Sequence, residues 1–153
     1  MLKEILPAIF ERDLRKLIDE INLYKDEDKL WAVQEGISNS AGNLCLHLIG
    51  NLNHFIGATL GNTGYVRYRD DEFALKNIPR QDLLINLANT MLIVKKTLSE
   101  LKDEELEKDF PLQVFGRPVK TGFMLVHLST HLSYHLGQIN YHRRLIEIGR
   151  AHV

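Results

Sequence analysis

Apolar residues recur every three or four positions in four long stretches of the chain, at about residues 2–23, 41–60, 81–101 and 121–148. This spacing places the apolar side chains on one face of an α-helix and leaves polar residues on the other face. Each stretch is long enough for about five helical turns, and no convincing strand pattern competes with them. The sequence therefore predicts an all-α fold, a four-helix bundle in which the four apolar faces pack together.

The connections between these stretches differ in length. Residues 24–40 are polar and turn-rich, and we expect Trp31 within them to pack inward. Residues 61–80 hold three turn signals and five charged residues between positions 67 and 72. A loop this long inside a compact domain is usually functional or a crossover, so we expect it to return along the bundle between the second and third helices. Residues 111–120 hold two short β-like runs, which predict a small hairpin or an extended link.

The composition is that of an ordinary globular chain. Its 153 residues, 44% hydrophobic and 25% charged, fit one domain spanning residues 1–153 that buries roughly 70% of its unfolded surface. A formal net charge of −1 without a basic stripe argues against a nucleic-acid partner. No apolar run approaches the roughly 20 residues of a membrane span, and Cys45 is the single cysteine. We therefore expect a cytoplasmic protein with no membrane partner.

Histidines are concentrated in the last predicted helix, which carries four of the seven in the chain: His127, His131, His135 and His142. Residues four apart lie about 6 Å from each other on one helix face, so the first three form a ladder. Neutral imidazoles at i and i+4 can both point at one cation about 2.1 Å from each ring nitrogen, as in helical zinc sites. The ladder therefore predicts a metal site. Its third ligand must come from another helix, because one helix face offers only two well-placed groups.

The second predicted helix offers two candidates for that ligand, His47 and His54. They lie about 10.5 Å apart along the helix axis, so they cannot both bind one ion, and the spacing does not choose between them. The competing interpretation makes His131 and His135 core residues whose rings are satisfied by Ser, Asn or Tyr neighbours. Each inward nitrogen left unpaired costs about 1–3 kcal/mol, and one metal ion satisfies several nitrogens at once, which favours the metal site.

Two motifs resemble a known family. His47, together with His131-x-x-x-His135 and the His-Leu-Gly-Gln run that ends at Gln138, is similar to the DinB/YfiT-like superfamily, whose members are classed as metalloenzymes. The run that starts at Leu44, LCLHLIGNLNHFIGATLGNTGYVRYRDDEF, resembles a subgroup of uncharacterised small bacterial DinB-like proteins. The resemblance implies a divalent metal, Zn or Ni, held by His47, His131 and His135. It also implies a four-helix bundle with a long crossover, and frequently a homodimer.

The resemblance and the chemistry together suggest further roles. Some members of the superfamily resemble transferases or isomerases that use glutathione, mycothiol or bacillithiol, which makes a low-molecular-weight thiol a candidate cofactor. Three nitrogen ligands leave a coordination position open for water or a thiolate. We expect Asn51 and Gln138 to orient the imidazole rings, unless they form an ordinary buried amide pair, and His127 to line the pocket or bond the backbone. Arg67 and Arg69 are candidates for binding a substrate carboxylate, although solvated loop charges are the commoner case.

These expectations define two functional hypotheses. The first is a metal-dependent enzyme, a transferase or hydrolase that activates a small thiol and acts on a small-molecule substrate that the sequence does not identify. The second is a non-enzymatic dimeric binding or stress-response module in which the histidines hold a structural metal or none. No Asp or Glu in either ligand helix has a spacing that clearly faces the ion, so the sequence predicts no general base.

Overall fold

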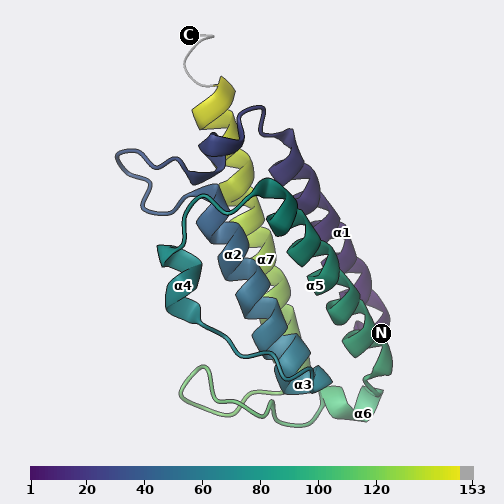
Figure 1. Ribbon diagram of the computed structural model, residues 1–153. Helices are drawn as coiled ribbons and strands as arrows, with labels where there is room; N and C mark the ends of the chain where they lie inside the picture. The colour runs from purple at the N-terminus through teal and green to yellow at the C-terminus, as the bar shows by residue number, and fades with distance from the viewer. Residues whose placement is uncertain (149–153) are drawn as a thin grey trace.

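The structure, a computed structural model, describes residues 1–148 (Figure 1). This part of the chain is helical with connecting turns and contains no β-strand, so the predicted all-α class is confirmed for it. Its long helices are α1 (Leu2–Leu23), α2 (Ala41–Leu52), α5 (Arg80–Glu100) and α7 (Thr121–Arg143). The shorter ones are η1 (Glu27–Trp31), α4 (Arg69–Ala74) and α6 (Asp103–Leu106).

Two of the long helices continue beyond a regular α-helix. The chain runs from α2 through a π-helical segment, η2 (Asn53–Ala58), into α3 (Thr59–Gly61), so the helix predicted at about 41–60 is present but changes its winding near the end. The last helix likewise passes into a π-helical segment, η3 (Arg144–Ile148). At the start of α2, the hydroxyl of Ser40 accepts a hydrogen bond from the Asn43 backbone N–H at 3.1 Å. Ser40 is thus the N-cap of α2.

The four long helices lie side by side (Figure 1). Helix α1 packs against α5 and α7, and α2 packs against α7 and α5. Helices α1 and α7 run in one direction and α2 and α5 in the other, so the connection from residue 62 to residue 79 has to travel back along the outside of α2 (Figure 1). That connection carries α4, which packs on α2. The arrangement puts α2 and α7 antiparallel and in contact, with α4 next to them.

The core is built from the apolar faces of these helices. In α1 the fully buried side chains follow the helical period, at Phe10, Leu14, Leu17 and Ile21. Burying a side chain of this size contributes about 1.5–3 kcal/mol. Trp31 is 9% exposed and covers Gly42, where an added Cβ would lie 2.7 Å from the indole ring, so the predicted inward packing of Trp31 is confirmed. None of the described helices is both long and apolar enough to cross a bilayer.

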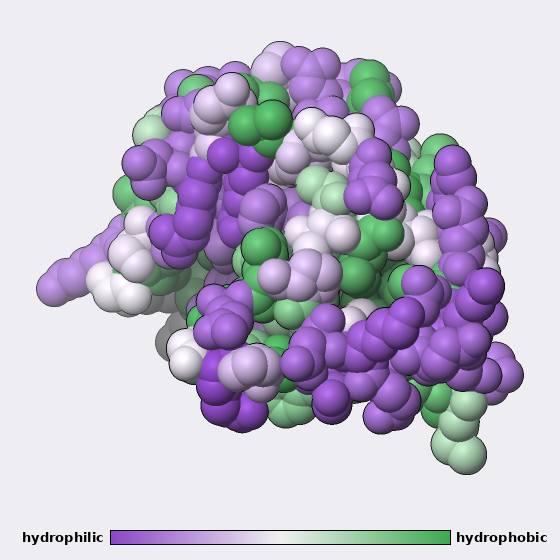
Figure 2. Space-filling model, turned by 90° about the horizontal axis from the view of Figure 1, so that it is seen from below, coloured by the Kyte–Doolittle hydropathy of each residue, from purple (hydrophilic) through white to green (hydrophobic). Residues whose placement is uncertain are grey.

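The connection before α7 is not the small hairpin that was one of the two forms predicted for it. Residues 111–120 form no strand, and the only ladder-like contact described there is an isolated bridge between Asp109 and Lys120. A hairpin is disfavoured because Pro111 and Pro118 lack a backbone N–H for strand pairing. This connection belongs to the lower end of the molecule, where hydrophilic side chains cover most of the surface and hydrophobic ones lie between them (Figure 2).

Candidate metal centre

Three histidines from two helices meet between α2 and α7. The Nε2 atom of His131 lies 3.2 Å from Nε2 of His47 and 3.1 Å from Nε2 of His135. One ring nitrogen from each of the three lies within 4.8 Å of the others. The structure thus brings together His47, His131 and His135, the three residues that the family resemblance proposes as ligands.

The two helices supply these residues in the way the spacing requires. His131 and His135 lie one turn apart on α7, so their rings lie on the same face of the helix, where they meet edge to face. His47 comes from the middle of α2 and enters from the facing side, and it is 7% exposed. His54 is not part of the cluster, since its ring packs against Phe55 with 4.7 Å between ring centroids. Of the two candidates that the spacing leaves open, His47 is therefore the one that meets the α7 histidines.

Hydrogen bonds on the outer sides of two rings fix where their protons sit. His47 Nδ1 lies 3.0 Å from the carboxylate oxygen Oε1 of Glu72, and His135 Nδ1 lies 2.7 Å from the amide oxygen of Gln138. Both oxygens only accept hydrogen bonds, so the neutral rings carry their protons on Nδ1. Their Nε2 lone pairs consequently both face Nε2 of His131.

This proton arrangement leaves an unfavourable contact that a cation would remove. His131 has one proton when neutral, and its Nδ1 is buried without a hydrogen-bond partner among the described residues. A single proton on Nε2 can bond only one of the two facing lone pairs, whereas a metal ion accepts all three. Metal–nitrogen bonds of about 2.0–2.1 Å place neighbouring ligand nitrogens about 3.0–3.4 Å apart. The two contacts through His131 fall in that range, so the three residues fit a metal ion.

Burial favours the neutral rings of His47 and His131, and the neutral ring is the form that binds metal. Burial, together with the nearby His135 and His47, lowers the pKa of His131 to about 4. Burial also lowers the pKa of His47, although its hydrogen bond with Glu72 opposes the shift.

A buried carboxylate that the sequence did not predict as part of the site supports His47. This carboxylate is Glu72, in α4, which is 6% exposed. Arg67 donates two hydrogen bonds to it, from Nε to Oε2 and from Nη2 to Oε1, each at 2.8 Å. Arg67 is therefore engaged by Glu72, which disfavours its predicted role in binding a substrate carboxylate. The guanidinium of Arg69 lies over the ring of Phe73 at 5.3 Å from the centroid. Glu72 appeared in the sequence only as one of several loop charges.

The residues expected around the ligands differ in whether they contact the three histidines. Gln138 contacts His135 as predicted. Asn51 is 7% exposed, and its side-chain oxygen has no hydrogen-bond partner among the described residues, so it bonds none of the three rings through that atom. The ring of His127 stacks on His131 at 6.4 Å between centroids and meets Phe115 edge-on at 4.8 Å, which places it beside the cluster. Cys45 is fully buried in the core.

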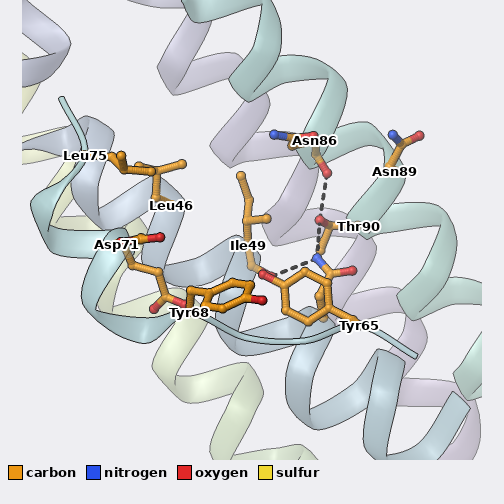
Figure 3. Close-up of a pocket in the computed structure, with 11 residues that line it drawn as sticks. Leu46, Ile49, Tyr65, Tyr68, Asp71, Leu75, Asn86, Asn89 and Thr90 are labelled. Atoms are coloured by element: carbon orange, nitrogen blue, oxygen red, sulfur yellow. Dashed lines mark hydrogen bonds between the residues drawn. The ribbon is translucent and has the colours of Figure 1, made fainter. Parts of the chain in front are cut away.

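One pocket reaches the cluster, and a second reaches Glu72, which contacts His47. The larger, about 790 Å³, lies between the connection before α2 and the last part of α7, and its lining includes His135, Gln138, Tyr134 and Ser38. The smaller, about 340 Å³, lies on the other side of α2 and includes Glu72. In it, Tyr65, Tyr68 and Asp71 face Asn86 and Thr90 of α5 across α2 residues Leu46 and Ile49 (Figure 3). A small molecule in the larger pocket would touch one of the three histidines directly.

Helix α7 also holds a histidine outside the cluster, His142, whose environment is purely structural. His142 Nε2–H donates to the carbonyl oxygen of Ala32 at 2.8 Å, and its Nδ1 accepts from the hydroxyl of Tyr24 at 2.5 Å. Both ring nitrogens are thereby satisfied in the neutral form, and burial lowers the pKa of His142. This residue joins α7 to the end of α1 and to the segment after η1.

Fold and site together define an all-helical protein with a cluster of three histidines that could hold a metal ion. The chain belongs to the family described as protein of unknown function DUF1572, which matches residues 6–150. Among curated proteins, no sequence matches the chain. The family description carries no activity, so the function has to be argued from the site.

Proposed function

We propose that this protein binds a divalent metal ion, Zn²⁺ or Ni²⁺, through His47, His131 and His135 and is an enzyme that uses the ion on a small-molecule substrate. The observation that carries the proposal is the convergence of three imidazole Nε2 atoms. In two of the rings, those of His47 and His135, the proton is held on Nδ1, on the side away from this point. Both ions suit imidazole ligands.

The neighbouring groups support a catalytic rather than a closed structural site. Three histidines leave a fourth position free, and a metal in that setting supplies Lewis acidity to a bound oxygen or sulfur group. Gln138 holds the His135 ring at the edge of the larger pocket. The hydroxyls of Tyr134 and Ser38 lie in the same lining and can bind and orient polar groups of a substrate.

We also propose that the protein is DinB-like. In its favour are the all-helical architecture, the pair of histidines on α7 with a third on the antiparallel α2, and the long connection that carries α4 outside α2. We accordingly propose a four-helix bundle with a crossover between α2 and α5, a small thiol as the group activated in a transfer reaction, and a homodimer as the assembly.

Metal analysis tests the first step. Protein purified without a polyhistidine tag should contain close to one divalent ion per chain, and His131→Ala should lose it because two of the three contacts pass through that ring. His54→Ala is the matched control, since His54 lies in η2, the π-helical continuation of the helix that carries His47, but outside the cluster. Wild-type protein without metal, or His131→Ala with full metal content, would contradict the proposal.

A second measurement separates catalysis from a structural metal. In protein loaded with Co²⁺, an open coordination position lets a small thiol or azide change the visible absorption spectrum, whereas a closed four-ligand site does not respond. A spectrum that changes with thiol at low concentration supports the transferase chemistry. A spectrum indifferent to every added ligand would favour a non-enzymatic binding module.

A further inference from the structure

The backbone of α2 is open where Glu72 approaches it. An added Cβ on Gly50 would lie 1.9 Å from Glu72 Oε2 and 2.6 Å from the carboxyl carbon. No side chain larger than a hydrogen fits there while Glu72 keeps its place. Gly50 is three residues from His47 on the same helix, so the carboxylate rests on the turn of α2 that follows the ligand.

Burying Glu72 and Arg67 is costly, and stability alone does not account for it. Removing both charges from water costs several kcal/mol per ion, and such pairs often contribute little net stability. Arg67 bonds both carboxylate oxygens and lies 5.8 Å from the ring centroid of Phe55, which fixes the guanidinium. The pair therefore holds one carboxylate oxygen, Oε1, in a defined position facing His47.

The contacts of His47 Nδ1 assign its proton. Arg67 Nη2 lies 3.4 Å from this nitrogen, and Glu72 Oε1 lies 3.0 Å from it. Arginine can only donate and a carboxylate can only accept, so Nδ1 satisfies one of them and not both. The shorter contact, and the engagement of Arg67 with Glu72, place the proton on Nδ1 and leave Nε2 free.

We propose that Glu72 is a positioning residue for His47: held by Arg67 and resting on Gly50, it fixes the ring with its proton on Nδ1 and its Nε2 lone pair directed at the ion. This rests on the proposed function, because it assigns a role at the same site. The positive charge of Arg67 offsets the negative charge of Glu72, so the pair orients the ligand without adding net charge to the centre. Since both residues belong to the connection between α2 and α5, that connection is fastened to the site.

Metal affinity of two variants tests the proposal. Glu72→Ala should weaken binding of Zn²⁺ or Co²⁺ by about 10–100-fold, as is usual when the partner of a ligating histidine is removed, and should alter the Co²⁺ absorption spectrum. Glu72→Gln, which keeps an acceptor oxygen but cannot form the ion pair, should fall between this variant and wild type. Glu20→Gln is the matched control, because it breaks the comparably buried pair of Glu20 and Arg143, which lies outside the cluster of three histidines.

Nitrogen-15 NMR of the imidazoles tests the same idea without metal. Wild-type His47 should show the Nδ1–H form, and Glu72→Ala should show a mixture of both neutral forms. If wild type binds no metal but the proton position depends on Glu72, the proposed function fails and the positioning role stands. If metal binds and Glu72→Ala changes neither affinity nor proton position, or if Glu20→Gln weakens metal binding as much, the positioning role fails and the proposed function stands.

Discussion

Replacing Gly50 with alanine is the sharpest test of how closely the helix and the carboxylate fit. Because the new Cβ would lie 1.9 Å from Glu72 Oε2, and non-bonded heavy atoms do not approach so closely, the carboxylate has to move by about 1 Å or more. His47 Nδ1 and Glu72 Oε1 are 3.0 Å apart, and a shift of that size takes a hydrogen bond out of its effective range. The same shift disturbs the paired contacts with Arg67.

Two opposing terms set the expected size of the effect. Alanine in a helix interior is more favourable than glycine by about 0.8–1.0 kcal/mol. Loss of a hydrogen bond to a charged group costs about 1.5–3 kcal/mol, and this term is the larger. We expect Gly50→Ala to lower the free energy of unfolding by about 0.5–2 kcal/mol, at about 2–4 °C in Tm per kcal/mol for a chain of this size.

Gly137 provides the matched control. It lies inside α7, and an added Cβ there would meet nothing within 4 Å, so Gly137→Ala should gain stability by about 0.8–1.0 kcal/mol from helix propensity alone. Urea unfolding followed by circular dichroism measures both variants, and a chelator competition measures their metal affinity. If Gly50→Ala is stabilised as much as Gly137→Ala and keeps wild-type metal affinity, the reasoning about Glu72 is wrong.

Two further predictions concern buried groups away from the metal ligands. Because burial lowers the pKa of His142, the unfolded chain binds the proton more readily, so the contribution of neutral His142 is complete above about pH 6.5 and declines as the pH falls below it. His142→Gln should therefore show a shallower loss of stability than wild type between about pH 6.5 and pH 5 in urea titrations, and equal slopes would refute this. Burial raises the pKa of Cys45 to about 12, so a thiol reagent such as DTNB should label it only after unfolding, and rapid labelling of the native protein would count against its core position.

The helices and part of the site could be predicted because they depend on local spacing. Apolar residues at helical intervals predict the long helices, and the four-residue step from His131 to His135 predicts two imidazoles on one face. Those relations lie within a single helix and are visible in the sequence. The choice of His47 over His54 needs the relative level of α2 and α7, which local spacing does not contain, and the family resemblance supplied it.

Glu72 could not be predicted for the same reason. It lies 25 residues from His47, and their contact exists only because the connection between α2 and α5 packs back on α2. Within the sequence, Glu72 looks like the neighbouring exposed Asp70 and Asp71. The one available signal is Gly50, a glycine inside a predicted helix, which often marks a close approach of another group. Asn51, the adjacent residue, drew attention instead because its amide suggested a hydrogen bond to a ligand.

The antiparallel meeting of α2 and α7 also determines when the centre can form. His47 and His131 are 84 positions apart, and two of the three histidines lie in the last long helix. During synthesis a chain that ends before Thr121 holds only one of them, so synthesis must pass His135 before all three can bind one ion. Closing so long a loop is slow and entropically costly. The metal would therefore bind after α2 and α7 have packed together and would not direct the early steps of folding.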